Sequence, residues 1–118
     1  MIPSFYTSLS GLNAFQQQLN VAVNNLANVN TDGFKQSQIV LSSAEPQSVV
    51  AASKKLELHG PLALEQSADG VSVVEKLNVD VSQEMTGLIT AKRAYQANLK
   101  ALKAADETVE SLLDIVGR

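Results

Sequence analysis

Apolar residues recur every three or four positions through the first quarter of the chain. The recurring side chains are Phe5, Leu9, Leu12, Leu19, Val23 and Leu26, and Gln16 fills the one heptad position that is not apolar. This spacing predicts an amphipathic helix with a coiled-coil-like seam over about residues 4–29. Thr31-Asp32-Gly33 is typical of a turn, and we expect Gly33 to adopt a positive φ where the helix ends.

A longer stripe of the same period fills the last third of the chain. It contains Val81, Met85, Leu88, Tyr95, Leu99, Leu102, Val109, Leu113 and Val116, with Lys92 and Asp106 in two of the heptad positions. The stripe predicts a helix over about residues 80–116. We expect Asp80 to cap it, with Gln83 completing a capping box, and Asn78 is the competing cap residue.

The middle of the chain, residues 34–77, has no helical period. Ile39-Val40-Leu41 predicts an extended segment, residues 42–47 are loop-like, and His59-Gly60-Pro61 and Asp69-Gly70 are turn signals. We expect short strands at residues 55–58 and 71–75, and residues 49–53 fit either a strand or a helical turn. The predicted fold class is mainly α: an antiparallel hairpin of two long, coiled-coil-like helices joined by a short β-rich or irregular insert.

Antiparallel packing of the two helices predicts a register and an overhang. Leu26 should lie near Val81 or Met85, Leu19 near Leu88, and Leu12 near Tyr95 or Leu99. The second helix is the longer one, so roughly 20 Å of its stripe should lack a partner in the same chain. Its charges are segregated, because the basic residues Lys92, Arg93, Lys100 and Lys103 precede the acidic residues Asp106, Glu107, Glu110 and Asp114. Neighbouring molecules would complete such a chain.

Composition excludes several functional classes. The 118 residues suit one domain, and a net charge of -3 provides no basic excess for nucleic acid. With no Cys and a single histidine, His59, the chain lacks the residues for thiolate sites or sites with two imidazoles. No apolar run approaches the roughly 20 residues that span a bilayer, so we expect no direct membrane insertion. We predict no enzymatic activity, no cofactor and no metal.

The first helix is unusual because residues 1–31 contain no Asp, Glu, Lys, Arg or His. Its polar side chains are amides and hydroxyls, which can be buried at a much lower desolvation cost than ions. This pattern predicts a helix that is covered on more than one side, and a solvated amide-rich helix is the alternative. Asn24 and Asn25 are adjacent, so one of them should face the seam and the other should face outward.

Motifs at both ends resemble the signatures of bacterial flagellar rod and hook axial proteins. The N-terminal motif includes Asn24, Asn25, Ala27, Asn28, Asn30, Thr31, Gly33 and Phe34. The C-terminal motif includes Asn78, Asp80, Glu84, Arg93, Gln96 and Asn98. The insert of about forty residues is short for this family. The chain is therefore most similar to a short proximal rod protein.

The resemblance implies a single rod-type domain over residues 1–118 and a structural role in motility. The chain would be a subunit of the basal-body rod in the periplasmic space, exported by the flagellar type III apparatus without a cleaved signal peptide. Its partners would be copies of itself and other flagellar axial proteins. The expected seam and assembly residues are Leu9, Leu12, Leu19, Val23, Leu26, Met85, Leu88, Tyr95, Leu99, Leu102, Val109 and Leu113. The alternative function is a soluble coiled-coil adaptor or an export-chaperone-like binding module.

Overall fold

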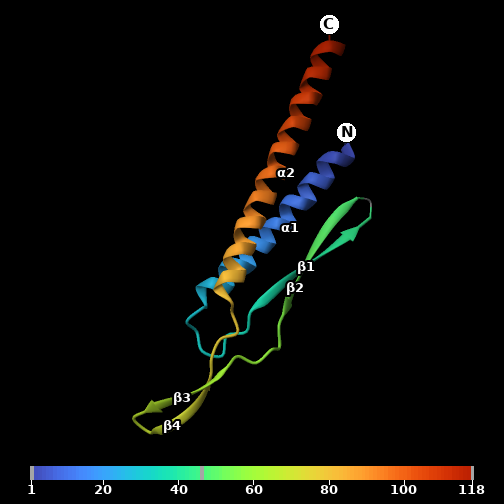
Figure 1. Ribbon diagram of the computed structural model, residues 1–118. Coiled ribbons are helices and arrows are strands. Elements are labelled where there is room, and N and C mark those ends of the chain that lie inside the picture. Colours follow the sequence, from blue (N-terminus) through green and yellow to red (C-terminus); the bar gives the residue numbers. More distant parts are fainter. Residues whose placement is uncertain (1, 46, 118) are drawn as a thin grey trace.

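The computed structural model describes residues 2–45 and 47–117 of an elongated molecule with extents of 83 × 23 × 19 Å. Two helices, α1 (Ile2–Ala27) and α2 (Val81–Val116), lie side by side and antiparallel (Figure 1). Four strands form the insert between them: β1 (Ser37–Ala44), β2 (Ser48–Lys55), β3 (Leu62–Ser67) and β4 (Gly70–Glu75). The prediction of terminal helices with a β-rich insert is therefore confirmed, and the insert consists of two separate antiparallel hairpins.

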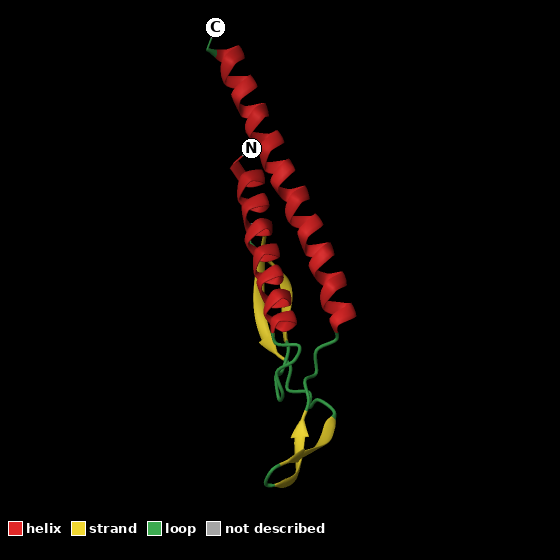
Figure 2. Cartoon of the chain, turned by 90° about the vertical axis from the view of Figure 1, so that its left-hand side faces the viewer, coloured by secondary structure: helices red, strands yellow, loops and turns green. Residues whose placement is uncertain are grey.

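Two contacts fix the register of the helix pair, and they agree with the predicted one. Near the insert, the Asn25 amide lies 2.9 Å from a Glu84 carboxylate oxygen. Near the other end, a β-carbon placed on Gly11 would lie 2.6 Å from the Asn98 amide nitrogen. Glycine therefore allows α1 to approach α2 closely at this point. Because Asn98 lies opposite Gly11, α2 extends about ten residues beyond the start of α1. Figure 2 shows the overhang.

The face of α2 that packs on α1 shares Leu88, Tyr95, Leu102 and Val109 with the predicted stripe. At the alternate positions the preceding residue, such as Ala91 or Asn98, takes the place of the predicted one. The buried and half-buried residues of α2 are Glu84, Gly87, Leu88, Ala91, Ala94, Tyr95, Asn98, Leu102, Ala105 and Val109. Small side chains at Ala91, Ala105 and Gly11 let the helices approach, and the larger side chains at Met85, Leu99 and Leu113 stay outside. The buried apolar residues of the described chain are few and mostly small: Leu12, Ala14, Ala22 and Ala91.

The β1–β2 hairpin packs along α1, so α1 lies between this hairpin and α2. Its register runs from Ser37 opposite Lys55 to Ala44 opposite Ser48. The predicted loop at residues 42–47 is therefore too long, because β1 continues to Ala44. Hydroxyl groups of α1 hold this end of the hairpin: Val49 N–H donates to Ser10 Oγ (3.2 Å), and Thr7 Oγ1 donates to the Gln47 carbonyl (2.7 Å). Residues 49–53, which fitted two structures, are a strand.

The β3–β4 hairpin projects from the end opposite the chain termini (Figures 1 and 2). Among the described elements it packs against neither helix and not against the other hairpin. One of its faces carries four exposed apolar side chains: Leu62, Leu64, Val71 and Val73. The predicted strand at residues 71–75 is confirmed, but the one at 55–58 is wrong because β2 ends at Lys55. Side-chain amides bond to the backbone there and replace a neighbouring strand, as described below.

Hydrogen bonds from polar side chains define the ends of both helices. α1 ends at Ala27, two residues earlier than predicted, and the next residues form turns in which Asn28 N–H and Asn28 Nδ2 both donate to the Asn24 carbonyl. Gly33 follows these turns with φ +68°, which confirms its predicted conformation. Asp80 caps α2 by accepting from the backbone N–H groups of Ser82 (2.9 Å) and Gln83 (3.3 Å). Asp80, and not Asn78, is therefore the N-cap.

Gly60 offers a sharp test of the packing between the insert and the start of α2. It is buried, and a β-carbon there would overlap the carbonyl oxygens of Lys76 and Leu77. We expect Gly60→Ala to reduce the free energy of unfolding by about 3 kcal/mol, since the obstructing atoms are backbone. Urea unfolding followed by circular dichroism measures this change.

Gly87→Ala is the matched control, because Gly87 lies inside α2 with nothing within 4 Å of the added carbon. Replacing a helical glycine with alanine should stabilise the chain by roughly 0.5–1 kcal/mol. Equal shifts for the two variants would contradict the described packing at Gly60.

Candidate functional site

The centre of the molecule is a junction formed by the side chain of Asn25. This residue is fully buried, at 0% exposure. Its Nδ2 donates to the Ser37 carbonyl (2.8 Å) and to Glu84 Oε1 (2.9 Å), and its Oδ1 accepts from Ser37 N–H (3.0 Å). One amide therefore satisfies both backbone groups of the first residue of β1 and also reaches α2. Adjacent Asn24 is exposed, as expected for the outward member of the pair.

A second amide, that of Asn78, joins the two ends of the insert just before α2. Its Oδ1 accepts from Gln36 N–H (2.8 Å), and its Nδ2 donates to the Leu58 carbonyl (2.7 Å). Together, Asn25 and Asn78 bind the backbone of residues 36, 37 and 58, which lie just at or beyond the last pair of the β1–β2 ladder. The amides therefore take hydrogen-bonding positions that another strand would occupy.

Charged residues tie the projecting hairpin to the turn after α1. The Lys76 ammonium contacts Asp32 Oδ1 (2.9 Å) and the carboxylate of Glu65. Hydrogen bonds to Glu65 and then to Asp32 raise the pKa of Lys76 above its usual value, so the ammonium remains charged at physiological pH. Glu75 Oε1 accepts from Gly60 N–H (3.1 Å), and Gly33 N–H donates to the Glu75 carbonyl (2.7 Å).

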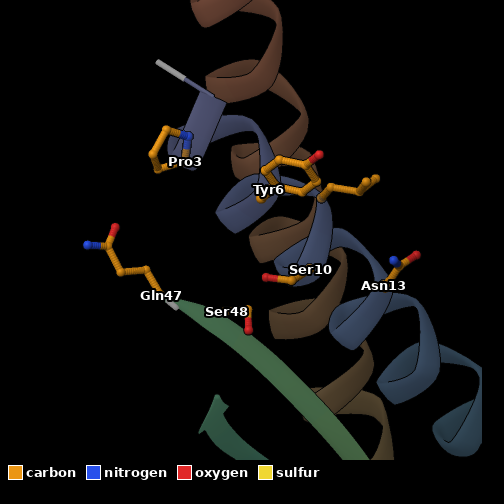
Figure 3. Close-up of a pocket in the computed structure, with 7 residues that line it drawn as sticks. Pro3, Tyr6, Ser10, Asn13, Gln47 and Ser48 are labelled. Atoms are coloured by element: carbon orange, nitrogen blue, oxygen red, sulfur yellow. The ribbon is translucent and has the colours of Figure 1, made fainter. Parts of the chain in front are cut away.

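A groove of about 600 Å³ lies between the first turns of α1 and the start of β2. Figure 3 shows Pro3, Tyr6, Ser10 and Asn13 on the helix, and Gln47 and Ser48 on the hairpin. Tyr6, one of the residues that line the groove, is 65% exposed. Among the described residues that line this groove none is charged, which matches the uncharged sequence of α1.

The structure places the expected seam residues in three environments. Leu12 is buried between the packed elements. Leu19, Leu26, Leu88, Tyr95, Leu102 and Val109 are half-buried. Leu9, Val23, Met85, Leu99 and Leu113 are exposed in the single chain. The exposed group lies beside the seam and not in it, so only a neighbouring molecule could cover these side chains.

The family-motif residues gather mainly around the two amide junctions. Asn25, Asn78 and Glu84 form the bonds described above, and Asp80 caps α2. Phe34 and Asn28 are half-buried near the turn, whereas Ala27, Asn30, Thr31 and Gly33 are exposed. Asn98 is half-buried opposite Gly11, and Arg93 and Gln96 are exposed on α2.

Several contacts were not predicted from sequence. The hydroxyls of Thr7 and Ser10 bond to the hairpin, and Lys76 links Asp32 to Glu65. Serine and threonine in a helix usually bond to their own backbone, so their positions gave no sign of these contacts. Within the described ranges, no group of three His, Cys, Asp or Glu side chains could hold a metal ion, and no helix is long and apolar enough to cross a membrane. The site is therefore a set of hydrogen-bonded junctions and uncovered apolar surfaces.

Comparison with known proteins places both terminal segments in flagellar families. Residues 5–35 match the family described as "Flagella basal body rod protein", and residues 71–115 match "Flagellar basal body rod FlgEFG protein C-terminal". The chain is also 35% identical to the flagellar basal-body rod protein FlgC of Escherichia coli, over 88% of this chain and 86% of that protein. The chain belongs to the flagellar basal-body rod protein family. The resemblance seen in the terminal motifs is thus confirmed.

Other members of the flagellar axial group are similar to shorter parts of this rod-family chain. The rod protein FlgG of Bacillus subtilis is 42% identical over 45% of this chain, and the hook protein FlgE of Caulobacter vibrioides is 52% identical over 37%. The chain spans only 20% and 7%, respectively, of these longer proteins. The hydrogen bond between Asn25 and Glu84 joins the two matched segments, because Asn25 lies in the first segment and Glu84 in the second.

The buried amide of this rod-family chain can be tested with a nearly isosteric change. Asn25→Asp would replace a donor with an oxygen that faces the Ser37 carbonyl and the Glu84 carboxylate. We expect a loss of roughly 3–5 kcal/mol in the free energy of unfolding at neutral pH, since a buried charge would face two acceptors and keep only Ser37 N–H as a donor. Lowering the pH should reduce the loss, because a protonated carboxyl donates again. Urea titrations at several pH values measure both effects.

Asn24→Asp controls for the added charge and should shift the free energy of unfolding by less than roughly 0.5 kcal/mol, since Asn24 is exposed. Adding Glu84→Gln to Asn25→Asp should recover part of the loss, because a glutamine amide can donate to the new carboxylate. If Asn25→Asp were as mild as Asn24→Asp, the junction would not have the described hydrogen bonds.

Proposed function

We propose that this protein is a structural, non-enzymatic subunit of the flagellar basal-body rod that assembles through its terminal helices into a helical axial tube. The observation that carries the proposal is the similarity to FlgC, which extends over most of both chains. The short insert further favours a short proximal rod protein. The whole chain, residues 1–118, would act as one rod-type domain.

The exposed apolar surface of α2 supports assembly. Beyond the start of α1, the overhanging end of α2 carries Leu112, Leu113, Ile115 and Val116, all of them exposed. Val116 is 83% exposed and Leu113 is 67% exposed. Covering each such side chain is worth roughly 1.5–3 kcal/mol, so packing against neighbouring subunits would stabilise the assembled state strongly.

The outward face of α1 supports the same conclusion from its polar residues. Asn13, Gln16, Gln17, Asn20 and Asn24 are exposed in the single chain, and residues 1–31 provide no ion. Amides can pair with amides of another subunit without leaving a buried charge. The seam and assembly residues that are exposed here, such as Leu9 and Val23, would lie in the same contacts.

The partners would be copies of this chain and other flagellar rod and hook proteins, since proteins with these names share its terminal segments. The rod lies in the periplasmic space, and we propose export by the flagellar type III apparatus without a cleaved signal peptide. The names of the relatives denote structural parts of the flagellum and do not favour a soluble adaptor or an export chaperone.

Concentration-dependent assembly tests the proposal directly. The purified chain should form sedimentable polymers whose size keeps growing with concentration, because contacts that do not close form helical filaments. In cells, deleting its gene should abolish motility, and the product should be found in purified basal bodies. A defined small complex in solution together with normal motility of the deletion strain would refute the rod function.

The outward amide face provides a separate prediction. Asn24→Asp should leave the single chain folded and secreted but prevent polymerisation and motility, because the assembled layer would bury a carboxylate with no cation in residues 1–31. Lowering the pH toward the pKa of the carboxyl should partly restore sedimentation, since the neutral acid is tolerated when buried. Asn24→Ser, which stays uncharged, is the control and should assemble. Normal motility with Asn24→Asp would show that this face remains in contact with water.

A further inference from the structure

One uncovered face of α2 carries a stripe with a residue at every seventh position. The stripe consists of Met85, Lys92, Leu99, Asp106 and Leu113. Positions seven apart lie on nearly the same side of a helix. All five side chains are exposed, with Met85 at 46% and Leu99 at 49%, because α1 packs on the neighbouring face. α1 therefore leaves this stripe of three apolar side chains, one cation and one anion uncovered.

The order of residues along the stripe distinguishes among the ways two copies could pair. If two parallel α2 helices were aligned without a shift, Lys92 would face Lys92 and Asp106 would face Asp106. A shift of one heptad would place each charge opposite an apolar side chain. A shift of fourteen residues instead places Met85 opposite Leu99, Lys92 opposite Asp106, and Leu99 opposite Leu113. Of these three parallel alignments, only the shift of fourteen residues places apolar side chains opposite apolar side chains and the lysine opposite the aspartate.

Charges beside the stripe repeat the same spacing. Arg93 precedes Glu107 by fourteen residues, and Lys100 precedes Asp114 by fourteen. Lys103 lies 3.7 Å from Glu107 within the same helix, an exposed pair of the kind that contributes little energy and can rearrange. Within the described residues, neither Lys92 nor Asp106 has an ion pair of its own, so both charges are available to a neighbour.

The part of the stripe from Leu99 to Asp106 also borders a groove that could receive another helix. This groove of about 520 Å³ is lined by Phe5 of α1 and by Leu99, Leu102, Lys103 and Asp106 of α2. It combines apolar walls with the Asp106 carboxylate and with Lys103, whose ammonium is paired with Glu107 in the same helix. The apolar walls and the carboxylate, which is unpaired within the described residues, complement a helix segment that presents apolar side chains and a lysine. The Met85 to Leu99 segment of a second copy has this composition.

We propose that the stripe is the contact between α2 helices of neighbouring copies, parallel and displaced along the axis by fourteen residues, or about 21 Å. Lys92 of one copy pairs with Asp106 of the next. This inference rests on the proposed rod function and specifies its register. An ion pair inside an apolar seam is a device that selects one register over others.

The displaced contact is heterologous, so it leaves free surface at each end of a growing assembly. Each α2 uses its Lys92 half against one neighbour and its Asp106 half against another. A straight helix drifts by about 20° per heptad, so the two halves face directions that differ by about 40°. An antiparallel pair centred on Leu99 would also place Lys92 opposite Asp106, but that contact is isologous and closes at a dimer.

Charge reversal in the full chain tests the pairing. We expect Lys92→Asp alone and Asp106→Lys alone to abolish sedimentable polymer at concentrations where the unchanged chain polymerises. The double variant Lys92→Asp/Asp106→Lys should restore polymer. Both side chains are exposed, so circular dichroism of the single chains should remain unchanged. Ala101→Glu, an exposed change on the side of α2 opposite the stripe, is the control and should still polymerise.

Cysteine cross-linking tests the register, because the chain has no cysteine of its own. Under oxidation, Met85→Cys/Leu99→Cys should give a ladder of many linked copies. Met85→Cys/Leu113→Cys should give none, because these positions face different residues in the displaced register. A dimer from Leu99→Cys alone, or from Met85→Cys/Leu113→Cys, would indicate the antiparallel pair or the unshifted parallel pair, and either result would overturn the proposal.

The outcomes separate this inference from the rod function. Polymer from the unchanged chain and from both single reversals would overturn the Lys92–Asp106 contact and leave the rod function standing. Failure of the double reversal to restore polymer would also overturn that contact. If the unchanged chain failed to polymerise and its gene were dispensable for motility, the rod function and this inference would fail together.

Discussion

The fold depends on the buried side-chain amide of Asn25, which bonds to the backbone N–H and carbonyl groups of Ser37 as a neighbouring strand would. Asn25 belongs to α1, but its bonds satisfy the first residue of β1 and reach a carboxylate on α2. Because an amide has both donors and an acceptor, it can replace a peptide group of a neighbouring strand. Aspartate, leucine or serine would each lack part of this set. The relative positions of the two helices and the first hairpin therefore depend on a single residue type.

The rest of the packing buries few apolar side chains. The buried apolar residues of the described chain are mainly alanines, and most larger side chains on the helices remain half-buried or exposed. A core of this kind gives a defined register through close approach, as at Gly11 and Asn98, but limited hydrophobic stabilisation. The chain is thus ordered by hydrogen bonds and small-residue contacts, while much of its apolar surface stays exposed.

The sequence was sufficient to predict the helices, their register and the positive φ of Gly33, because these depend on local period and turn chemistry. It was not sufficient for the insert, where β1 extends through serines that appeared loop-like and β2 ends before Leu56. Those limits are set by distant groups, namely Ser10 on α1 and Asn78 before α2. On the face of α2 that meets α1, only alternate positions were predicted correctly, because the alanines, Glu84 and Asn98 at the other positions carry a weaker apolar signal than Leu99 or Met85. Of the site, the motif asparagines were identified, but their hydrogen bonds required the three-dimensional structure.

The β3–β4 hairpin has a consequence for how this architecture can vary. It joins the helix pair through a short connection fastened by Lys76, Gly60 and Asn78, and it packs against no other described element. The fastening lies at the base of the hairpin, so what extends beyond the base is structurally separate from the helices. A longer or different domain could therefore replace the hairpin beyond its base without altering the register of α1 and α2. Such modularity would let one pair of helices carry inserts of different length.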